Sequence, residues 1–258
     1  MFFKRTLQLQ PLSNIPVRTT KDRVESYLTS KALLSSDRLV GVDRRNQSVK
    51  LLDVVQHKVL HQLRVDSMPT SVCSLPVTRV AVALPYGNTL LILDCVNQLS
   101  IVSTITVQGK CTEVAYSNGH LIVLYGAPRK IEILNLNGRV VKRKQLEIST
   151  HLLHNWLSVT TEGNVPSIYV GDYTNSRILR LDEDLQEQQV YPVPNRAKPW
   201  GLLAVGENQL LVRELNNRLW QLDSTMGRWT RLNQGEWYIG IFSMAFCHDR
   251  HVLYSGDL

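Results

Sequence analysis

The stretch SIYVGDYTNSRILRLDEDLQ, residues 167–186, contains two runs of strand-forming residues and two polar turns. Residues 168–172 and 177–181 are rich in side chains that favour a pleated backbone, and the polar stretch after each run interrupts it. A pair of antiparallel strands standing alone is barely stable in water, because its apolar faces need neighbouring strands to cover them. The rest of the chain must therefore supply those strands.

The same hairpin pattern recurs along the whole chain, at intervals of roughly 41 to 47 residues. Its copies are LVGVDRRNQSVKLLD from Leu39, VAVALPYGNTLLILD from Val80, LIVLYGAPRKIEILN from Leu121, IYVGDYTNSRILRLD from Ile168, LLVRELNNRLWQLD from Leu210 and an incomplete VLYSGDL from Val252. The full copies end on Asp53, Asp94, Asn135, Asp182 and Asp223. Each of these small polar residues suits the start of a tight turn, because its side chain can bond the backbone just ahead.

Two further strand-like runs lie between one hairpin and the next, so each unit holds four short strands. Four strands in a unit of about 40 to 45 residues are typical of a β-propeller blade. Six such units fill the 258 residues. We therefore predict an all-β chain forming one six-bladed β-propeller domain, residues 1–258. The expected blades are approximately 25–66, 67–108, 109–150, 151–194, 195–238, and 239–258 together with 1–24.

The last unit has only two strand-like runs, IFSMAF and HVLYSG, and nothing after them for its outer strands. At the other end of the chain, FFKRTLQLQ and NIPVRTT precede the first full unit. We expect the N-terminal and C-terminal strands to share one blade and close the ring, because closure removes exposed strand edges.

Bulk composition excludes several protein classes. A hydrophobic content of 43% with 20% charged residues does not fit a disordered or collagen-like chain. No apolar run reaches the roughly 18 to 20 residues of a membrane-spanning helix, and charges interrupt the start MFFKRTLQLQPL. Four cysteines without a CxxC pair, Cys73, Cys95, Cys111 and Cys247, suit free thiols. We expect a soluble cytoplasmic protein without a membrane partner.

The phrases RLVGVDRRNQSVKLLD and IYVGDYTNSRILRLD, with WLSVTTEGNVP before the second and KPWGLLAVGENQLLV after it, resemble the NHL class of six-bladed propeller. The resemblance implies the C-terminal, target-binding domain of a TRIM-like protein, whose ubiquitin-ligase activity and oligomerisation would lie in other domains. The NHL-type Asp after the second strand is present as Asp43 and Asp172, but Leu84 and Tyr125 replace it in units two and three. No binding residue of the family can therefore be transferred.

The net charge of +7 favours an anionic partner. With the strands of a blade named a to d, the b–c and d–a loops emerge on one face, and the a–b and c–d loops on the other. The first face should be basic and the second acidic. The candidate partner-binding residues are Arg44, Arg45, Tyr86, Lys110, Arg129, Lys130, Tyr173, Arg177, Arg196, Lys198, Trp200, Arg218 and Trp237.

Two kinds of partner fit such a face. Arg, Tyr and Trp are enriched at protein interfaces, so a protein or peptide partner is the first interpretation. Arginines interleaved with aromatic rings also suit single-stranded RNA, in which splayed bases stack on the rings. Some NHL domains of TRIM-like proteins bind RNA on this face, which is a further implication of the resemblance.

The sequence does not predict an enzyme, a metal site or a cofactor. Some six-bladed propellers are calcium-dependent lactonases, but the residues expected around the channel are Asp43, Leu84, Tyr125, Asp172, Glu214 and Gly256. That ring is too apolar for a cation that takes six or more oxygen ligands. The histidine pairs at 57/61, 151/154 and 248/251 are not expected on a helix and lack the Cys/His cluster of a metal site, and no HExxH, P-loop, GxGxxG or GxSxG motif occurs.

Overall fold

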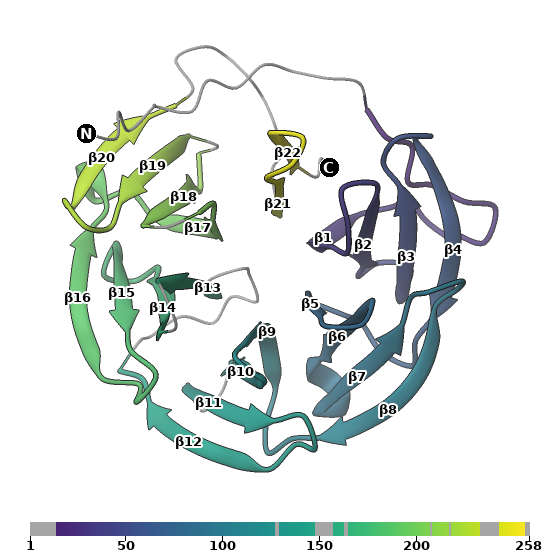
Figure 1. Cartoon of the computed structure of the whole chain (residues 1–258), viewed down its shortest axis with the longest axis horizontal. Helices are drawn as coiled ribbons and strands as arrows, with labels where there is room; N and C mark the ends of the chain where they lie inside the picture. The colour runs from purple at the N-terminus through teal and green to yellow at the C-terminus, as the bar shows by residue number, and fades with distance from the viewer. Residues whose placement is uncertain are drawn as a thin grey trace.

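The protein is a β-propeller in a computed structural model that describes residues 14–126, 129–147, 157–162, 165–206, 208–216, 218–232 and 243–255. Five four-stranded antiparallel sheets stand around a common axis (Figure 1). Each sheet uses four consecutive strands in sequence order, with the first strand nearest the axis and the fourth at the rim. The predicted all-β propeller is confirmed.

The sheets are named blades I to V in chain order. Blade I consists of β1 (Leu28–Leu33), β2 (Arg38–Asp43), β3 (Ser48–Asp53) and β4 (Lys58–Arg64). Blade II consists of β5 (Ser71–Leu75), β6 (Arg79–Leu84), β7 (Thr89–Asp94) and β8 (Ser100–Thr106), with a short 3-10 helix at Pro85–Gly87. Blade III consists of β9 (Cys111–Ser117), β10 (His120–Tyr125), β11 (Lys130–Asn135) and β12 (Val140–Gln145).

The second half of the ring follows the same plan. Blade IV consists of β13 (Leu157–Glu162), β14 (Val165–Asp172), β15 (Arg177–Leu181) and β16 (Glu187–Pro192). Blade V consists of β17 (Pro199–Ala204), β18 (Gln209–Glu214), β19 (Leu219–Asp223) and β20 (Arg228–Arg231), preceded by a 3-10 helix at Pro194–Arg196. The last sheet has two strands, β21 (Met244–Cys247) and β22 (Val252–Ser255).

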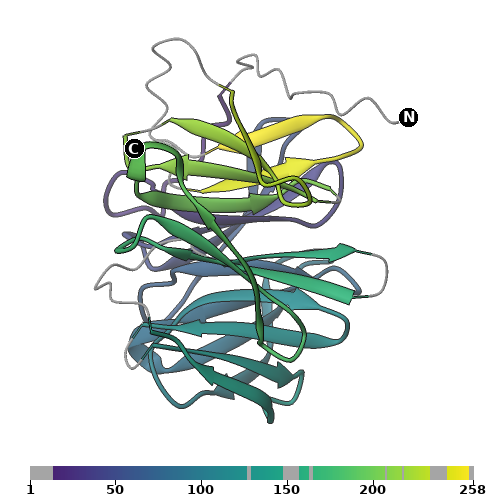
Figure 2. The same ribbon diagram turned by 90° about the vertical axis from the view of Figure 1, so that its left-hand side faces the viewer.

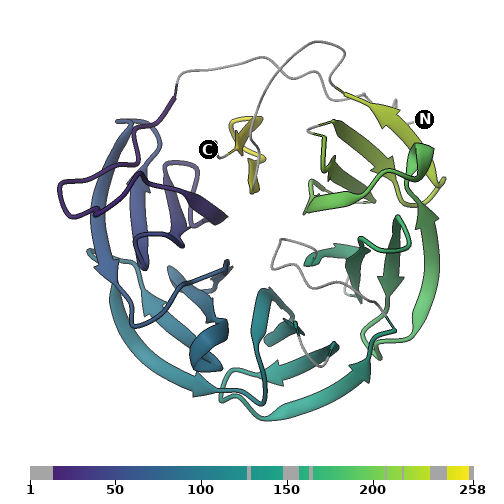
Figure 3. The ribbon, with the colours of Figure 1, turned by 180° about the vertical axis from the view of Figure 1, so that it is seen from behind.

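The prediction of six blades is wrong for the part of the chain that the structure describes, which forms five blades and this two-stranded sheet. The β21–β22 pair stands in the ring between blade V and blade I (Figures 1 and 3). Seen from the side, it lies next to the strands of blade V (Figure 2). The two C-terminal strands form where the sequence predicted them, but no described strand pairs with the outer edge of β22.

The described N-terminal residues are held on blade I, which explains why they do not pair with β22. Residues 14–27 contain no strand. The Nζ of Lys50 in β3 donates to the Val17 carbonyl at 2.9 Å and pairs with Asp22 at 2.7 Å, and Gln62 in β4 donates to Asp22 at 2.8 Å. These bonds hold the segment against β3 and β4. The other predicted closing strand, residues 2–10, lies outside the described residues.

The apolar core is divided into layers between adjacent sheets. One cluster packs blade I on blade II, and similar clusters join II to III, III to IV and IV to V. Smaller clusters join the β21–β22 sheet to blade I through Ala245 and to blade V through Met244. Middle strands such as β6 are buried on both faces, so they have continuous apolar sequences, whereas the rim strand β8 is largely exposed.

The turn residues act as predicted. The carboxylates of Asp53, Asp94 and Asp223 accept backbone N–H bonds from residues two or three positions ahead, at 2.7 to 3.1 Å. Asn135 and Asp182 accept similar bonds from residues two and four positions ahead. Because the bonds satisfy amides that the sheets leave unpaired, each c–d turn starts at a fixed residue.

Candidate functional site

All the candidate partner-binding residues except Trp237 lie among the described residues. The b–c loops carry Arg44, Arg45, Tyr86, Arg129, Tyr173 and Arg218; β11 and β15 begin at Lys130 and Arg177; Lys110, Arg196 and Lys198 lie between blades; and Trp200 lies in β17. The strand pairing puts the b–c and d–a loops at one end of the ring, since Ser48 at the start of β3 pairs with Arg64 at the end of β4. We call this end the basic face.

Lys130 is buried beneath the basic face. It is 6% exposed, its Nζ lies 2.7 Å from Glu132 Oε1, and it sits 4.2 Å from the ring centre of Tyr125. Burial raises the pKa of Glu132, but hydrogen bonds from Lys130, Tyr125 and Arg143 outweigh burial and hold that pKa below its ordinary value. Lys130 therefore serves the interior of blade III and offers no contact surface to a partner.

The acids at this end of the ring are also used internally. Asp43 and Asp172 end the b strands of blades I and IV, are fully buried, and accept the backbone N–H of the residue three positions ahead at 3.1 Å. Asp43 lies 2.9 Å from Lys50, and Asp172 lies 2.8 Å from Arg177. These two residues therefore brace their b–c turns, and their negative charges are neutralised inside the blades.

The cations that remain exposed on the basic face include Lys21, Arg23, Arg45, Arg64, Lys110 and Arg196. Lys21 and Arg23 belong to the N-terminal segment, which reaches this end because the Arg23 and Val24 amides donate to Asn46 in the first b–c loop. Among the described residues that expose their side chains here, the acids are Glu25, Asp66 and Glu147. The exposed charge of the basic face is therefore mainly positive.

Aromatic rings accompany these cations. Arg45 lies 5.2 Å from the ring centre of Tyr27, and Lys110 lies 5.9 Å from that of Tyr86, whose side chain is 52% exposed. A third group joins blades IV and V. Tyr173 and Trp200 meet edge to face at 5.8 Å, and Lys198 lies 5.6 Å from the Tyr173 ring while donating to the Thr174 carbonyl at 2.8 Å. We call Tyr173, Lys198 and Trp200 the aromatic cluster.

The opposite face was expected to be acidic, and this expectation is wrong. Its exposed acids are Asp37, Glu183, Asp184, Glu187 and Asp249, and its exposed cations are Lys58, Arg79, Arg139, Arg228 and Arg250. Several acids that the sequence assigns to this end are half-buried or buried, because they bind the amides of the c–d turns. The two ends of the ring therefore differ in exposed charge: one end is mainly positive, and the other carries both acids and cations.

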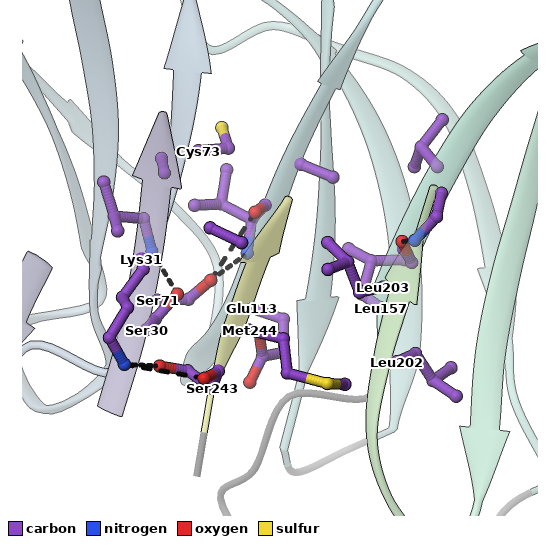
Figure 4. Close-up of a pocket in the computed structure, with 18 of the residues that line it drawn as sticks. Ser30, Lys31, Ser71, Cys73, Glu113, Leu157, Leu202, Leu203, Ser243 and Met244 are labelled. Carbon is purple, nitrogen blue, oxygen red and sulfur yellow. Dashed lines mark hydrogen bonds between the residues drawn. The ribbon is translucent and has the colours of Figure 1, made fainter. Parts of the chain in front are cut away.

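A cavity of about 290 Å³ occupies the axis of the ring and is lined by the innermost strand of every sheet (Figure 4). Ser30, Lys31, Ser71, Glu113 and Ser243 are among its polar lining residues. Sequence reasoning did not single out Glu113. Only the strand pairing draws attention to Glu113. It shows that Glu113 occupies the position that Ser30 occupies in blade I and Ser71 in blade II.

The described residues of the ring expected for a calcium-dependent lactonase make other contacts. Asp43 and Asp172 are bonded as described, Leu84 and Tyr125 are buried, and Glu214 Oε1 accepts the Trp220 indole N–H at 2.5 Å. Within the described parts of the chain, no three His, Cys, Asp or Glu side chains come together to hold a metal ion. His61 instead accepts the Leu99 backbone N–H at 3.2 Å, and His151 and His154 lie outside the described residues.

No protein-family model matches the sequence, and no curated protein matches it. Solved structures match by fold. Hydrazine synthase of Kuenenia stuttgartiensis aligns at a TM-score of 0.66 and 13% identity, over 92% of this chain and 76% of that chain. The WD40 β-propeller domain of Doa1 aligns at 0.64 and 11% identity, over 90% of each chain. The computationally designed Ika8 protein aligns at 0.56 and 13% identity, over 89% and 68%. These likenesses show the propeller fold alone.

Proposed function

We propose that this propeller is a non-catalytic recognition module that binds a protein or peptide partner through the basic face. The proposal rests on the distribution of charged side chains at that end of the ring. Its acids Asp22, Asp43 and Asp172 are paired with Lys50 or Arg177, while cations such as Arg45, Lys110 and Arg196 stay exposed. A surface of this kind attracts acidic partners and orients them.

The aromatic cluster adds a contact of a different kind. Tyr173 and Trp200 are both half-buried, so each ring is held by its surroundings and still offers a face to a partner. Rigid aromatic side chains of this type dominate the binding energy of many protein interfaces. The β-propeller fold, shared with the WD40 domain of Doa1, is also typical of protein-interaction modules. An acidic peptide with an apolar anchor is therefore the partner class that we favour.

Single-stranded RNA is the second candidate for the same face. It is favoured by the alternation of cations and rings, with Lys110 beside Tyr86 and Lys198 beside Tyr173. Bases could stack on these rings while the phosphates contact the cations. RNA binding of this kind would weaken steeply with salt, because each neutralised phosphate releases counterions.

The site is tested by selecting peptides from a random library on the purified domain and measuring their affinity by fluorescence anisotropy. We expect acidic peptides, and we expect the triple variant Arg45→Glu, Lys110→Glu, Arg196→Glu to bind them at least about tenfold more weakly. The matched control, Arg79→Glu, Arg139→Glu, Arg228→Glu, makes the same charge change at the opposite end. Equal losses in both variants would contradict the proposed site.

The same titrations with a single-stranded RNA oligonucleotide separate the two candidates. A protein-docking face predicts that Trp200→Ala weakens peptide binding more than any single charge reversal does. An RNA-binding face predicts salt-sensitive binding that is lost in the basic-face variant. Tight, salt-sensitive RNA binding with no selected peptide would replace the protein-docking proposal with the RNA proposal.

The predicted TRIM-like role and the predicted cytoplasmic location are also parts of this proposal. The NHL-like phrases support a role as the target-binding part of a TRIM-like protein, with any ubiquitin-ligase activity and oligomerisation outside the propeller. A cytoplasmic location is supported by four free thiols, of which Cys95, Cys111 and Cys247 are buried. Burial raises the pKa of Cys111 to about 11, so this thiol is unreactive at neutral pH. In the described residues, no helix is long and apolar enough to span a membrane.

A further inference from the structure

Glu113 in the axial cavity is placed differently from every other buried acid in the described residues. Its side chain belongs to β9, it is 3% exposed, and it lines the cavity (Figure 4). The Ser71 hydroxyl is its hydrogen-bond partner. No lysine or arginine in the described part of the chain forms an ion pair with it.

The other buried acids all have strong donors. Asp43 and Asp172 pair with cations, and Glu132 pairs with two. Glu214 accepts an indole N–H, and Asp223 accepts the backbone amides of its turn. Burying a carboxyl group without such partners costs free energy, and burial raises the pKa of Glu113 to about 8. No ion pair among the described residues offsets this free-energy cost.

The equivalent residues in other blades show what a structural side chain does at this position. Ser30, Ser71 and Glu113 each pair with the residue just before the end of their b strand. Ser30 accepts the Val72 N–H at 3.1 Å, and Ser71 accepts the Val114 N–H at 3.2 Å, so each serine joins its blade to the next. Glu113 makes no such bond to blade IV among the described residues. Its carboxyl group therefore faces the cavity without joining two blades.

Two cations line the cavity with Glu113. Lys31 in β1 donates to Ser243 Oγ at 2.6 Å, beside β21. Arg213 in β18 pairs with Gly201 of β17 and also lines the cavity. Burial and the Ser71 hydrogen bond govern the ionisation of Glu113, and neither cation contributes. The cavity thus holds separated groups, a carboxyl on β9 and two cations near β21.

We propose that the axial cavity binds a small zwitterionic amine, whose ammonium group pairs with Glu113 and whose carboxylate lies toward Lys31 and Arg213. A cavity of about 290 Å³ accommodates a molecule of amino-acid size. The ligand's ammonium supplies the cation that Glu113 lacks within the fold. The hydroxyls of Ser30, Ser71 and Ser243 offer further hydrogen bonds around it. This site is separate from the basic face and does not depend on its function.

The test uses three linear six-carbon probes, 6-aminohexanoate, hexylamine and hexanoate, titrated into the purified chain by isothermal calorimetry. We expect 6-aminohexanoate to bind with a Kd on the order of 0.1 to 1 mM, hexylamine more weakly, and hexanoate most weakly. Failure of all three probes to bind, or hexanoate binding as tightly as 6-aminohexanoate, would overturn the proposal.

Proton release gives a second readout that needs no variant. Glu113 is mostly protonated at pH 7 when the cavity is free, because its pKa is about 8. Pairing with an ammonium group ionises it, so 6-aminohexanoate binding should release close to one proton per site. The release is measured by repeating the titration in buffers of different ionisation enthalpy. Binding without proton release would place the probe away from Glu113 and overturn the proposal.

Two variants complete the design. Glu113→Gln keeps the shape and removes the charge, and Glu113→Ser restores the residue type found at this position in blades I and II. Both should bind 6-aminohexanoate at least about tenfold more weakly, with no proton release. The control Glu187→Gln, at an exposed position in β16, should behave as the unaltered chain does. Unchanged affinity in a folded Glu113→Ser variant would contradict the proposal.

Discussion

Single carboxylates fix the corners of the blades. Asp43 Oδ1 accepts the Asn46 N–H, and its other oxygen accepts bonds from the Asn46 side chain, Ser26 and Lys50. Lys50 is fully buried and reaches Asp22 as well, so one cation joins the b strand, the c strand and the N-terminal segment. Asp172 repeats the turn bonds in blade IV, with Arg177 in place of the lysine.

Removing Asp43 should therefore cost much more stability than removing an acid of a c–d turn. Asp43→Ala leaves Lys50 buried with fewer partners, and we expect a loss of about 3 to 5 kcal/mol in the free energy of unfolding. The control Asp94→Ala loses a backbone bond at a c–d turn, which is worth about 1 kcal/mol. Urea unfolding at pH 7 measures both. Similar losses would mean that the Asp43 and Lys50 pair contributes little.

At the scale of elements, the c–d turn of blade III rests on the rim strand of blade II. Gly138 in that turn has a φ of +83°, and a Cβ there would collide with Ile105 of β8. Gly119, between β9 and β10, has a φ of +79° with open space around it. Both positions need the left-handed backbone that glycine adopts freely, but only the first also needs the absence of a side chain.

Variants at Gly119 and Gly138 distinguish the stability lost through backbone strain from the stability lost through the contact between blades II and III. Gly119→Ala should lose about 1 kcal/mol from backbone strain alone. Gly138→Ala should lose at least about 1 kcal/mol more, because the new methyl group pushes Ile105 out of its layer. Thermal and urea unfolding of the two variants measure the difference. Equal losses would show that the turn of blade III is not held against β8.

Across the whole molecule, the repeat predicted the propeller, the order of strands in each blade and the turn acids. The periodicity could do this because each blade is built from contacts between residues that are near in sequence. It could not predict that Lys50 holds residues 17–22 on blade I, because that contact joins segments without a shared repeat. The expected closing segment NIPVRTT is therefore found on blade I and not beside β22.

The candidate site was predictable in position but not in detail. The b–c and d–a loops carry the expected cations, because loop placement follows from strand order. Burial of Lys130 and pairing of Arg177 depend on acids within the same sheets, and sequence alone does not rank those contacts. Glu113 was missed because a glutamate in a strand is ordinary until its partners are known. Trp237, the remaining predicted residue, lies outside the described residues.

The central claim is that the basic face is where the partner binds, and a hydrogen-exchange footprint of the complex tests it most directly. With a selected peptide or RNA bound, we expect slower exchange in the b–c loops around residues 44–47, 85–88 and 173–176, and in the d–a segment around 193–198. The c–d turns at the opposite end should exchange as in the free protein. Protection confined to those turns or to the rim strands would contradict the account.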